Sequence, residues 1–185
     1  LVTVDQKAVQ NLAHAVRRCD LELAGIASSA YASALSSLVE DEQELGAACI
    51  DFGGGATGVS VFLRKHMIYA DSVALGGDLI TADLSAGLSV NTSFAERIKT
   101  IYGGLVATGM DDREMIEITS ETGDWEHDRR TVSRSDVIGI IRPRVEEILE
   151  DVRDCLRAAG FEHLPSRQIV LTGGGSQLPG LDALA

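Results

Sequence analysis

Apolar positions with two different patterns flank a run of glycines near the first third of the chain. Residues 47–50 are continuously apolar, which predicts a buried strand. Residues 59–64 alternate between apolar and polar side chains, which predicts a second strand with one buried face. Because only a short glycine-rich segment separates them, we expect a tight β-hairpin whose turn is Asp51-Phe52-Gly53-Gly54-Gly55-Ala56-Thr57-Gly58.

The remaining pattern predicts short strands interspersed with helices, in an α/β arrangement. A capping box at residues 3–6 and an acidic, solvated connector at residues 39–45 are also expected. Pro143 should kink the long helix or mark its effective first turn. Trp125, in a polar loop at 121–130, could anchor a partner or cover the local core. Helices are expected at 5–19, 29–38, 76–87, 93–102 and from Ser133 to Gly160, and strands at 21–27, 67–75, 115–119, 130–132 and 169–172.

The glycine hairpin has the composition of an anion-binding turn. Three glycines leave backbone N–H groups unscreened by side chains, and a concave run of amides binds anions. Asp51, at the end of the first strand, can hold a hydrated Mg²⁺ beside phosphate oxygens. A turn that only requires positive φ explains one such cluster equally well. A dinucleotide fingerprint is excluded because a strand follows the glycines, and a P-loop is excluded because no Gly-Lys-Ser/Thr follows.

A second glycine cluster favours the binding interpretation. The β-branched run 169–172 leads into Gly173-Gly174-Gly175-Ser176, and Pro179 then indicates the start of a short helix. A strand that leads through glycines to a helix N-terminus is a second arrangement suited to phosphate. The two clusters therefore predict two walls of one nucleotide cleft.

Composition limits the classes of partner. The chain has 185 residues, with 16 Lys and Arg against 28 Asp and Glu, so its net charge is −12. Such acidity disfavours nucleic acid or an anionic membrane surface as a partner through bulk charge. Three unpaired cysteines favour a reducing, cytoplasmic compartment. No zinc pattern or hydrolytic triad is visible. The start without Met and the end inside a motif predict a piece of a longer protein.

Four motifs together resemble the bacterial FtsA cell-division family. The first glycine cluster resembles the second phosphate loop of the actin, Hsp70 and sugar-kinase superfamily, and Leu171 to Ser176 resembles its adenosine loop. Between them, Leu75-Gly76-Gly77-Asp78-Leu79-Ile80-Thr81-Ala82-Asp83-Leu84 and Ala95-Glu96-Arg97-Ile98-Lys99-Thr100-Ile101-Tyr102-Gly103 stand in the FtsA order. The resemblance implies an α/β, actin-like (RNase H-like) subdomain with an inserted smaller α+β subdomain.

The resemblance also implies ATP and Mg²⁺ as cofactors, in a scaffold without a catalytic role. Glu96 and Lys99 alone would more often be an exposed ion pair on one helix face, but the resemblance places them at the adenine and ribose end of the cleft. The chain would carry at most half of the nucleotide cleft, so we expect feeble ATP affinity and no meaningful turnover. Ala56 and Gly58 depart from the Thr and carboxylate usual in the family, which should weaken binding further. The implied cofactor residues are Asp51 (which also holds Mg²⁺ through water), Gly53, Gly54, Gly55, Thr57, Gly76, Gly77, Asp78, Glu96, Lys99, Gly173, Gly174, Gly175 and Ser176.

Family anatomy implies a division into subdomains and a set of partners. Residues 1–19 would be the tail of subdomain 1A, residues 20–77 with 166–185 subdomain 2A, and residues 78–165 subdomain 2B. Subdomain 2B docks the C-terminal tail of FtsZ, and Arg142 and Arg144 are the expected contacts for its carboxylates.

The family self-associates into actin-like filaments, joins other divisome proteins and lies on the cytoplasmic face of the inner membrane at the division site. It links FtsZ filaments to that membrane during septum formation through a C-terminal amphipathic helix that this sequence lacks. Two alternatives stay open: a sugar-kinase-type phosphotransferase, or another actin-like protein such as a PilM-like pilus-assembly scaffold or an Hsp70-like chaperone.

Overall fold

The structure is a computed structural model that describes residues 3–119, 129–161 and 168–184. Helices and strands are interspersed along the chain, as the apolar pattern predicts. The helices are α1 (Gln6–Arg17), α2 (Ser29–Ser37), α3 (Glu40–Leu45), α4 (Gly77–Leu88), α5 (Thr92–Tyr102), α6 (Arg134–Ala158), the 3₁₀ turn η1 (Gly174–Gln177) and α7 (Leu181–Leu184). The strands are β1 (Ala47–Phe52), β2 (Thr57–Leu63), β3 (His66–Val73), β4 (Met115–Thr119), β5 (Arg129–Ser133) and β6 (Gln168–Thr172).

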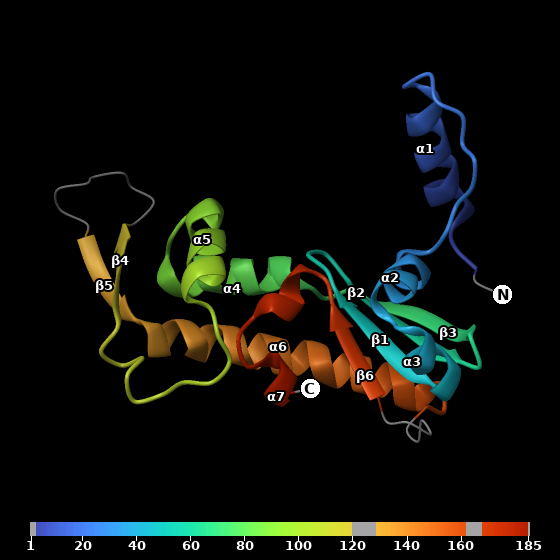
Figure 1. Ribbon diagram of the computed structural model, residues 1–185. Helices are drawn as coiled ribbons and strands as arrows, with labels where there is room; N and C mark the ends of the chain where they lie inside the picture. The colour runs from blue at the N-terminus through green and yellow to red at the C-terminus, as the bar shows by residue number, and fades with distance from the viewer. Residues whose placement is uncertain (1–2, 120–128, 162–167, 185) are drawn as a thin grey trace.

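Four of the strands form one mixed sheet in the order β3-β2-β1-β6 (Figure 1). The predicted glycine hairpin is confirmed, because β1 and β2 are antiparallel neighbours with Phe52 opposite Thr57. Strand β6 lies parallel to β1 on its other side, with Thr172 in register with Asp51. The two glycine clusters therefore leave the sheet at the same edge.

Helices cover both faces of this sheet, as Figure 1 shows for α2 on one side and the end of α6 on the other. Ala34 of α2 packs with Cys49 and Phe62 in a buried cluster. On the opposite face, Val152 of α6 packs with Ile50 and Val59. Alternate residues of β1 and β2 thus enter two separate cores, which explains why residues 47–50 are apolar without alternation.

The second part of the chain packs beside the sheet and is joined to it by α6. Helices α4, α5 and α6 and the hairpin β4–β5 enclose one core, in which Ile80, Ile98, Ile118 and Ile141 are almost completely buried. In Figure 1, α6 runs from this hairpin to the underside of the four-stranded sheet. Ser133 caps it, as expected, and forms a capping box with Asp136. The alternative that Pro143 marks the first turn is wrong, because the helix begins at Arg134 and Pro143 lies inside it. The predicted 2A and 2B boundaries stay a prediction.

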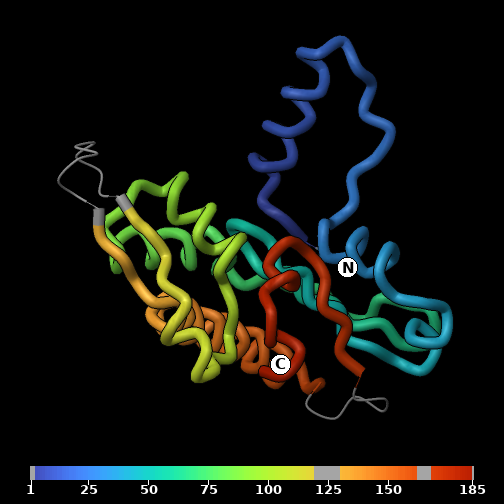
Figure 2. The backbone as a smooth tube through the Cα atoms, turned by 60° about the vertical axis from the view of Figure 1, so that its left-hand side comes forward, coloured from blue at the N-terminus to red at the C-terminus, as the bar shows by residue number. Residues whose placement is uncertain are grey.

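The expected strand at residues 21–27 is wrong. That segment has no regular secondary structure, and Leu21, Leu23 and Ile26 are exposed. Apolar residues do not form a strand unless a neighbouring strand takes their backbone hydrogen bonds. Helix α1 precedes it, buries none of its residues and projects away from the rest of the molecule (Figure 2).

Two local predictions also need correction, and a third is confirmed. The N-cap of α1 is Asp5, whose side chain accepts from the Lys7 N–H, so the expected cap at residues 3–6 is wrong. Residues 40–45 form the short helix α3 rather than an irregular connector, because three acidic side chains in its first turn favour a helix start. The short helix expected near Pro179 is confirmed as α7, which begins at Leu181 after the separate 3₁₀ turn η1. Trp125 lies outside the described residues. None of the described helices is long and apolar enough to cross a bilayer.

Ser60 should tolerate removal of its hydroxyl group. Its Oγ is buried without a hydrogen-bond partner in the part of the chain that the structure describes. An unsatisfied buried hydroxyl is costly, so we expect Ser60→Ala to stabilise the chain by about 0.5–1 kcal/mol. Thr57, on the same strand, is equally buried but donates to the Leu75 carbonyl at 2.8 Å. Thr57→Val should therefore destabilise the chain by about 1 kcal/mol. Urea unfolding of both variants measures these changes, and a lower stability of Ser60→Ala as well as Thr57→Val would contradict the difference between the two hydroxyls.

Candidate functional site

The shared sheet edge brings the first glycine loop (residues 53–56) beside the second glycine loop (residues 173–176). Their contact requires glycine. A Cβ on Gly175 would lie 2.0 Å from Cδ1 of the buried Phe52 ring, and a Cβ on Gly173 would lie 2.5 Å from Oδ1 of Asp51. Gly173 also has a φ of +85°, which favours glycine. The expected two walls of one cleft therefore adjoin each other.

The first glycine loop is also bonded to the start of α4. The N–H of Gly77 donates to Gly53 O, and the N–H of Asp78 donates to Gly54 O, both at 2.9 Å. Gly76 lies so close that a Cβ there would be 2.3 Å from Gly54 O. The loop carbonyls therefore satisfy two of the N–H groups that a helix leaves without intrahelical partners.

The first glycine loop keeps donors available after these contacts. Across the described residues, no partner is present for the N–H groups of Gly54 and Gly55. Both residues are exposed. Neighbouring amide donors without side-chain cover suit an anion such as phosphate.

A pocket of about 260 Å³ opens between the two glycine loops, α4 and α5. It combines backbone from the loops with one basic and two acidic side chains and a short apolar floor. This combination suits a ligand that has both an anionic and a partly apolar end. The lining residues are Gly53, Gly54, Gly77, Asp78, Ile80, Glu96, Lys99, Thr100, Gly174, Gly175, Gln177, Leu178 and Pro179.

The charged residues of α5 form a hydrogen-bonded group at this pocket. Lys99 Nζ lies 2.7 Å from Glu96 Oε2 and donates to Gly77 O at 3.1 Å. Partial burial alone would raise the pKa of Glu96, but hydrogen bonds from Lys99 and Thr81 outweigh it and hold that pKa below its usual value. Glu96 therefore remains a carboxylate at neutral pH.

Asp51 stands behind the junction of the glycine loops rather than in the lining of the pocket. Its Oδ2 accepts a hydrogen bond of 2.5 Å from the Ser33 hydroxyl on α2. Its Oδ1 faces the backbone of Gly173, as the close approach there indicates. The sequence pattern gave no reason to single out Ser33, because only the packing of α2 on the sheet brings it to Asp51.

The other predicted site residues shape the pocket or lie elsewhere. Thr57 is fully buried and bonds the segment before α4, while Ser176 Oγ donates to Gly173 O at 2.7 Å within the second glycine loop. Gly55 and Gly76 belong to the contacts of the first glycine loop but not to the pocket lining. Arg142 and Arg144 lie on α6, outside the lining. No group of three His, Cys, Asp or Glu that could hold a metal occurs within residues 3–119, 129–161 and 168–184.

Asp111 anchors the segment between α5 and β4 and should make stability depend on pH. Hydrogen bonds from the Thr108 hydroxyl and N–H, together with Arg134 at 2.9 Å, lower the pKa of Asp111 despite its burial. A carboxylate with a lowered pKa in the folded state contributes stability above its unfolded pKa of about 3.9 and loses it as pH falls further.

We therefore expect Asp111→Asn to lower the melting temperature at pH 7 and to have a smaller effect at pH 3. The exposed neighbour Asp112 provides the control, because Asp112→Asn should leave both melting temperatures unchanged. Equal losses for Asp111→Asn at the two pH values would contradict the assignment of a stabilising charge to Asp111.

Known proteins match the chain along its whole length. Residues 48–185 match the family model described as "Cell division protein FtsA". The chain is 43% identical over its full length to the cell division protein FtsA of Agrobacterium fabrum, and covers 42% of that relative. The Bacillus subtilis relative of the same name is 36% identical, with 41% of it covered. The chain thus spans less than half the length of the curated relatives it matches.

Solved structures resemble the fold at lower sequence identity. MreB5 of Spiroplasma citri bound to ADP superposes with a TM-score of 0.78 at 20% identity, over 97% of this chain and 57% of that one. A PilM–PilN type IV pilus biogenesis complex superposes with a TM-score of 0.69 at 19% sequence identity. The match covers 97% of this chain and 44% of that chain. These similarities confirm the actin-like fold, and the family match decides against the pilus-assembly, chaperone and sugar-kinase alternatives. The chain belongs to the FtsA family of cell-division proteins.

Proposed function

We propose that this chain is the part of an actin-like, ATP-binding cell-division scaffold that carries one half of the nucleotide cleft. The pocket between the two glycine loops is the observation on which the proposal depends, because it joins the unpartnered amide of Gly54 to two acidic side chains and one basic side chain. The structural neighbours from Spiroplasma citri are described as bound to ADP and AMPPNP, which agrees with a nucleotide in the corresponding fold. The scaffold binds nucleotide with at most weak turnover.

The described residues fit ATP and Mg²⁺ in their chemistry. The amides of Gly54 and Gly55 suit phosphate oxygens, and a side chain at Gly173 or Gly175 would block the junction between the loops. Glu96, which is paired with Lys99, supplies a carboxylate oxygen at the other end of the pocket. Mg²⁺ neutralises phosphate charge when it is bound, and Asp51 is the carboxylate that would hold it through water. Ala56 and Gly58 lack side-chain oxygens that could assist, which agrees with weak affinity.

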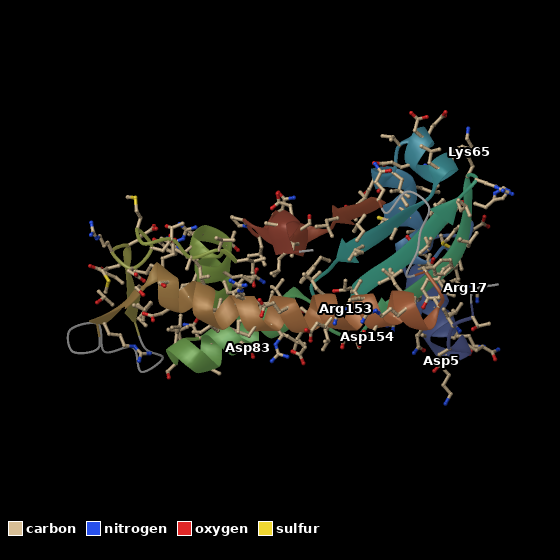
Figure 3. The ribbon with its side chains drawn as sticks, turned by 90° about the horizontal axis from the view of Figure 1, so that it is seen from below. Asp5, Arg17, Lys65, Asp83, Arg153 and Asp154 are labelled. Carbon is tan, nitrogen blue, oxygen red and sulfur yellow. The ribbon has the colours of Figure 1, made fainter. Side chains whose placement is uncertain are left out.

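The second part of the proposal is docking of the FtsZ C-terminal tail on α6 through Arg142 and Arg144. Arg142 is exposed and forms a local ion pair with Glu146, at 2.7 Å. Arg144 instead binds Asp83 of α4 through two hydrogen bonds, of 2.6 and 3.1 Å, and also pairs with Glu147. Figure 3 shows Asp83 at the side of α6. An acidic peptide can exchange with these carboxylates, and Arg144 also joins α4 to α6.

Calorimetric titration with the FtsZ tail peptide tests the docking proposal. Arg142→Ala should weaken binding with little effect on stability, because the ion pair that Arg142 forms with Glu146 is exposed. Arg144→Ala removes both the docking charge and the contact with α4. Asp83→Asn is the matched control, because it weakens the contact between α4 and α6 but keeps the arginine. Binding that Arg144→Ala weakens and Asp83→Asn preserves would support docking. Equal loss for both variants, or no binding by the folded chain, would overturn it.

Self-association and location follow from the same proposal. The complete scaffold forms actin-like filaments, joins the divisome and lies on the cytoplasmic face of the inner membrane at the division site. Membership of the FtsA family and the actin-like fold support these roles. The net charge of −12 disfavours direct contact with an anionic membrane surface, so we expect this chain not to sediment with anionic vesicles.

A further inference from the structure

Thr81 lies beneath the pocket, between its two interacting charged side chains. It is on α4, and only 4% of its surface is exposed. Its hydroxyl lies 2.5 Å from Glu96 Oε2 and accepts from Lys99 Nζ at 2.8 Å. The hydroxyl carries one proton, and the carbonyl of Gly77 is farther away, at 3.2 Å. Thr81 therefore donates to Glu96 and accepts from Lys99 at the same time.

Lys99 has no donor left for a ligand. An ammonium group has three N–H bonds. The three acceptors around it are Gly77 O at 3.1 Å, Thr81 Oγ1 at 2.8 Å and Glu96 Oε2 at 2.7 Å. Its side chain is only 15% exposed. Lys99 therefore affects the pocket indirectly, by holding Thr81 and Glu96 in place through its hydrogen bonds.

Glu96 retains one free oxygen at the pocket. Oε2 accepts from both Thr81 and Lys99, while no partner of Oε1 occurs among the residues that the structure describes. The side chain is 52% exposed and belongs to the pocket lining. A carboxylate oxygen in this position accepts hydrogen bonds and donates none. It suits a ligand that presents hydroxyl groups.

We propose that Thr81 is a positioning residue that, together with Lys99, fixes Glu96 as the hydrogen-bond acceptor for the sugar hydroxyls of a bound nucleotide. The inference rests on the proposed nucleotide function for the identity of the ligand. The positioning itself needs no ligand, because the three side chains already form one network. A buried hydroxyl on a helix is a rigid support, and such support determines how closely a polar group keeps its binding orientation.

The charge state of Glu96 gives a test without nucleotide. Hydrogen bonds from Lys99 and Thr81 outweigh the effect of burial and lower the pKa of Glu96, and Asp78 is the other acidic residue in the lining. Thr81→Val keeps the shape but removes the hydroxyl, so it should raise the pKa of Glu96, measured from the ¹³C shift of its carboxyl carbon. Thr81→Ser keeps the hydroxyl and should restore the wild-type pKa. An unchanged pKa in Thr81→Val would overturn the positioning role.

The ligand part is tested by comparing ATP with 2′,3′-dideoxy-ATP in amide-shift titrations of the same variants. The wild-type chain should prefer ATP by roughly tenfold, as expected for hydrogen bonds to a charged acceptor. Thr81→Val should lose most of this preference, and Thr81→Ser should retain it. A preference that persists in Thr81→Val would overturn the proposal. Binding of neither nucleotide by the wild-type chain would overturn the proposed function and the ligand assignment, while the carboxyl titration would still decide the positioning role.

Discussion

Replacing Gly76 by alanine is expected to destabilise the chain by about 3 kcal/mol and to separate the first glycine loop from α4. The added Cβ would lie 2.3 Å from Gly54 O and 2.7 Å from Gly53 O, and both are backbone atoms that cannot rotate away. The φ of Gly76 is −162°, so the cost comes from this contact and not from the backbone conformation. The two hydrogen bonds from Gly77 and Asp78 to the loop should lengthen. Urea unfolding and amide hydrogen exchange of residues 77 and 78 measure both effects.

Gly139→Ala is the matched control for this substitution. Gly139 lies in α6, and a Cβ there would meet nothing within 4 Å. Alanine has the higher helix propensity, so this variant should gain about 0.5–1 kcal/mol. Equal stability of the Gly76→Ala variant and the wild-type chain would show that the loop does not depend on this close approach.

Replacing Phe52 by alanine should cost about 3–5 kcal/mol, the range found when a buried aromatic ring is removed. Phe52 is 0% exposed and belongs to the larger core cluster. Its ring also fills the space over Gly175, where a Cβ would be 2.0 Å from Cδ1. The substitution should therefore loosen the second glycine loop as well as the core. Urea unfolding gives the first effect, and hydrogen exchange of residues 174–176 gives the second.

Phe52→Leu separates these two consequences. Leucine retains most of the buried volume, so its cost should stay below about 1.5 kcal/mol. It lacks the flat ring that covers Gly175, so exchange in the second glycine loop should still rise. If exchange there stays at the wild-type rate in both variants, the ring does not support that loop.

Elements with a strong local pattern could be predicted from the sequence. The glycine hairpin, α4, α5 and β6 lie within a few residues of their expected bounds, because each combines an apolar period with a clear turn or cap. The expected strand at 21–27 failed for the opposite reason. Its apolar residues suggested a strand, but strand formation depends on a neighbour that the local sequence does not specify.

The pocket could be predicted in part. Glycines and Asp51 mark the two strand ends directly, and the parallel pairing of β1 and β6 brings these ends together. Ser33, Thr81 and Asp83 were missed, because their roles depend on contacts of 18, 15 and 61 residues in sequence separation. Only the packing of α2 on the sheet, α4 on α5 and α4 on α6 creates these contacts. Spacing along one helix gave no indication of them.

An amide-shift titration of this chain with Mg²⁺-ATP would show whether the pocket between the two glycine loops binds nucleotide. We expect an affinity on the order of millimolar or weaker, with the largest shifts in the first and second glycine loops and around Glu96 and Lys99. The Gly76→Ala variant should lose these shifts. Shifts confined to other surfaces, or their absence at saturating nucleotide, would contradict a nucleotide pocket here, and micromolar affinity would contradict the claim that this chain carries only half of the cleft.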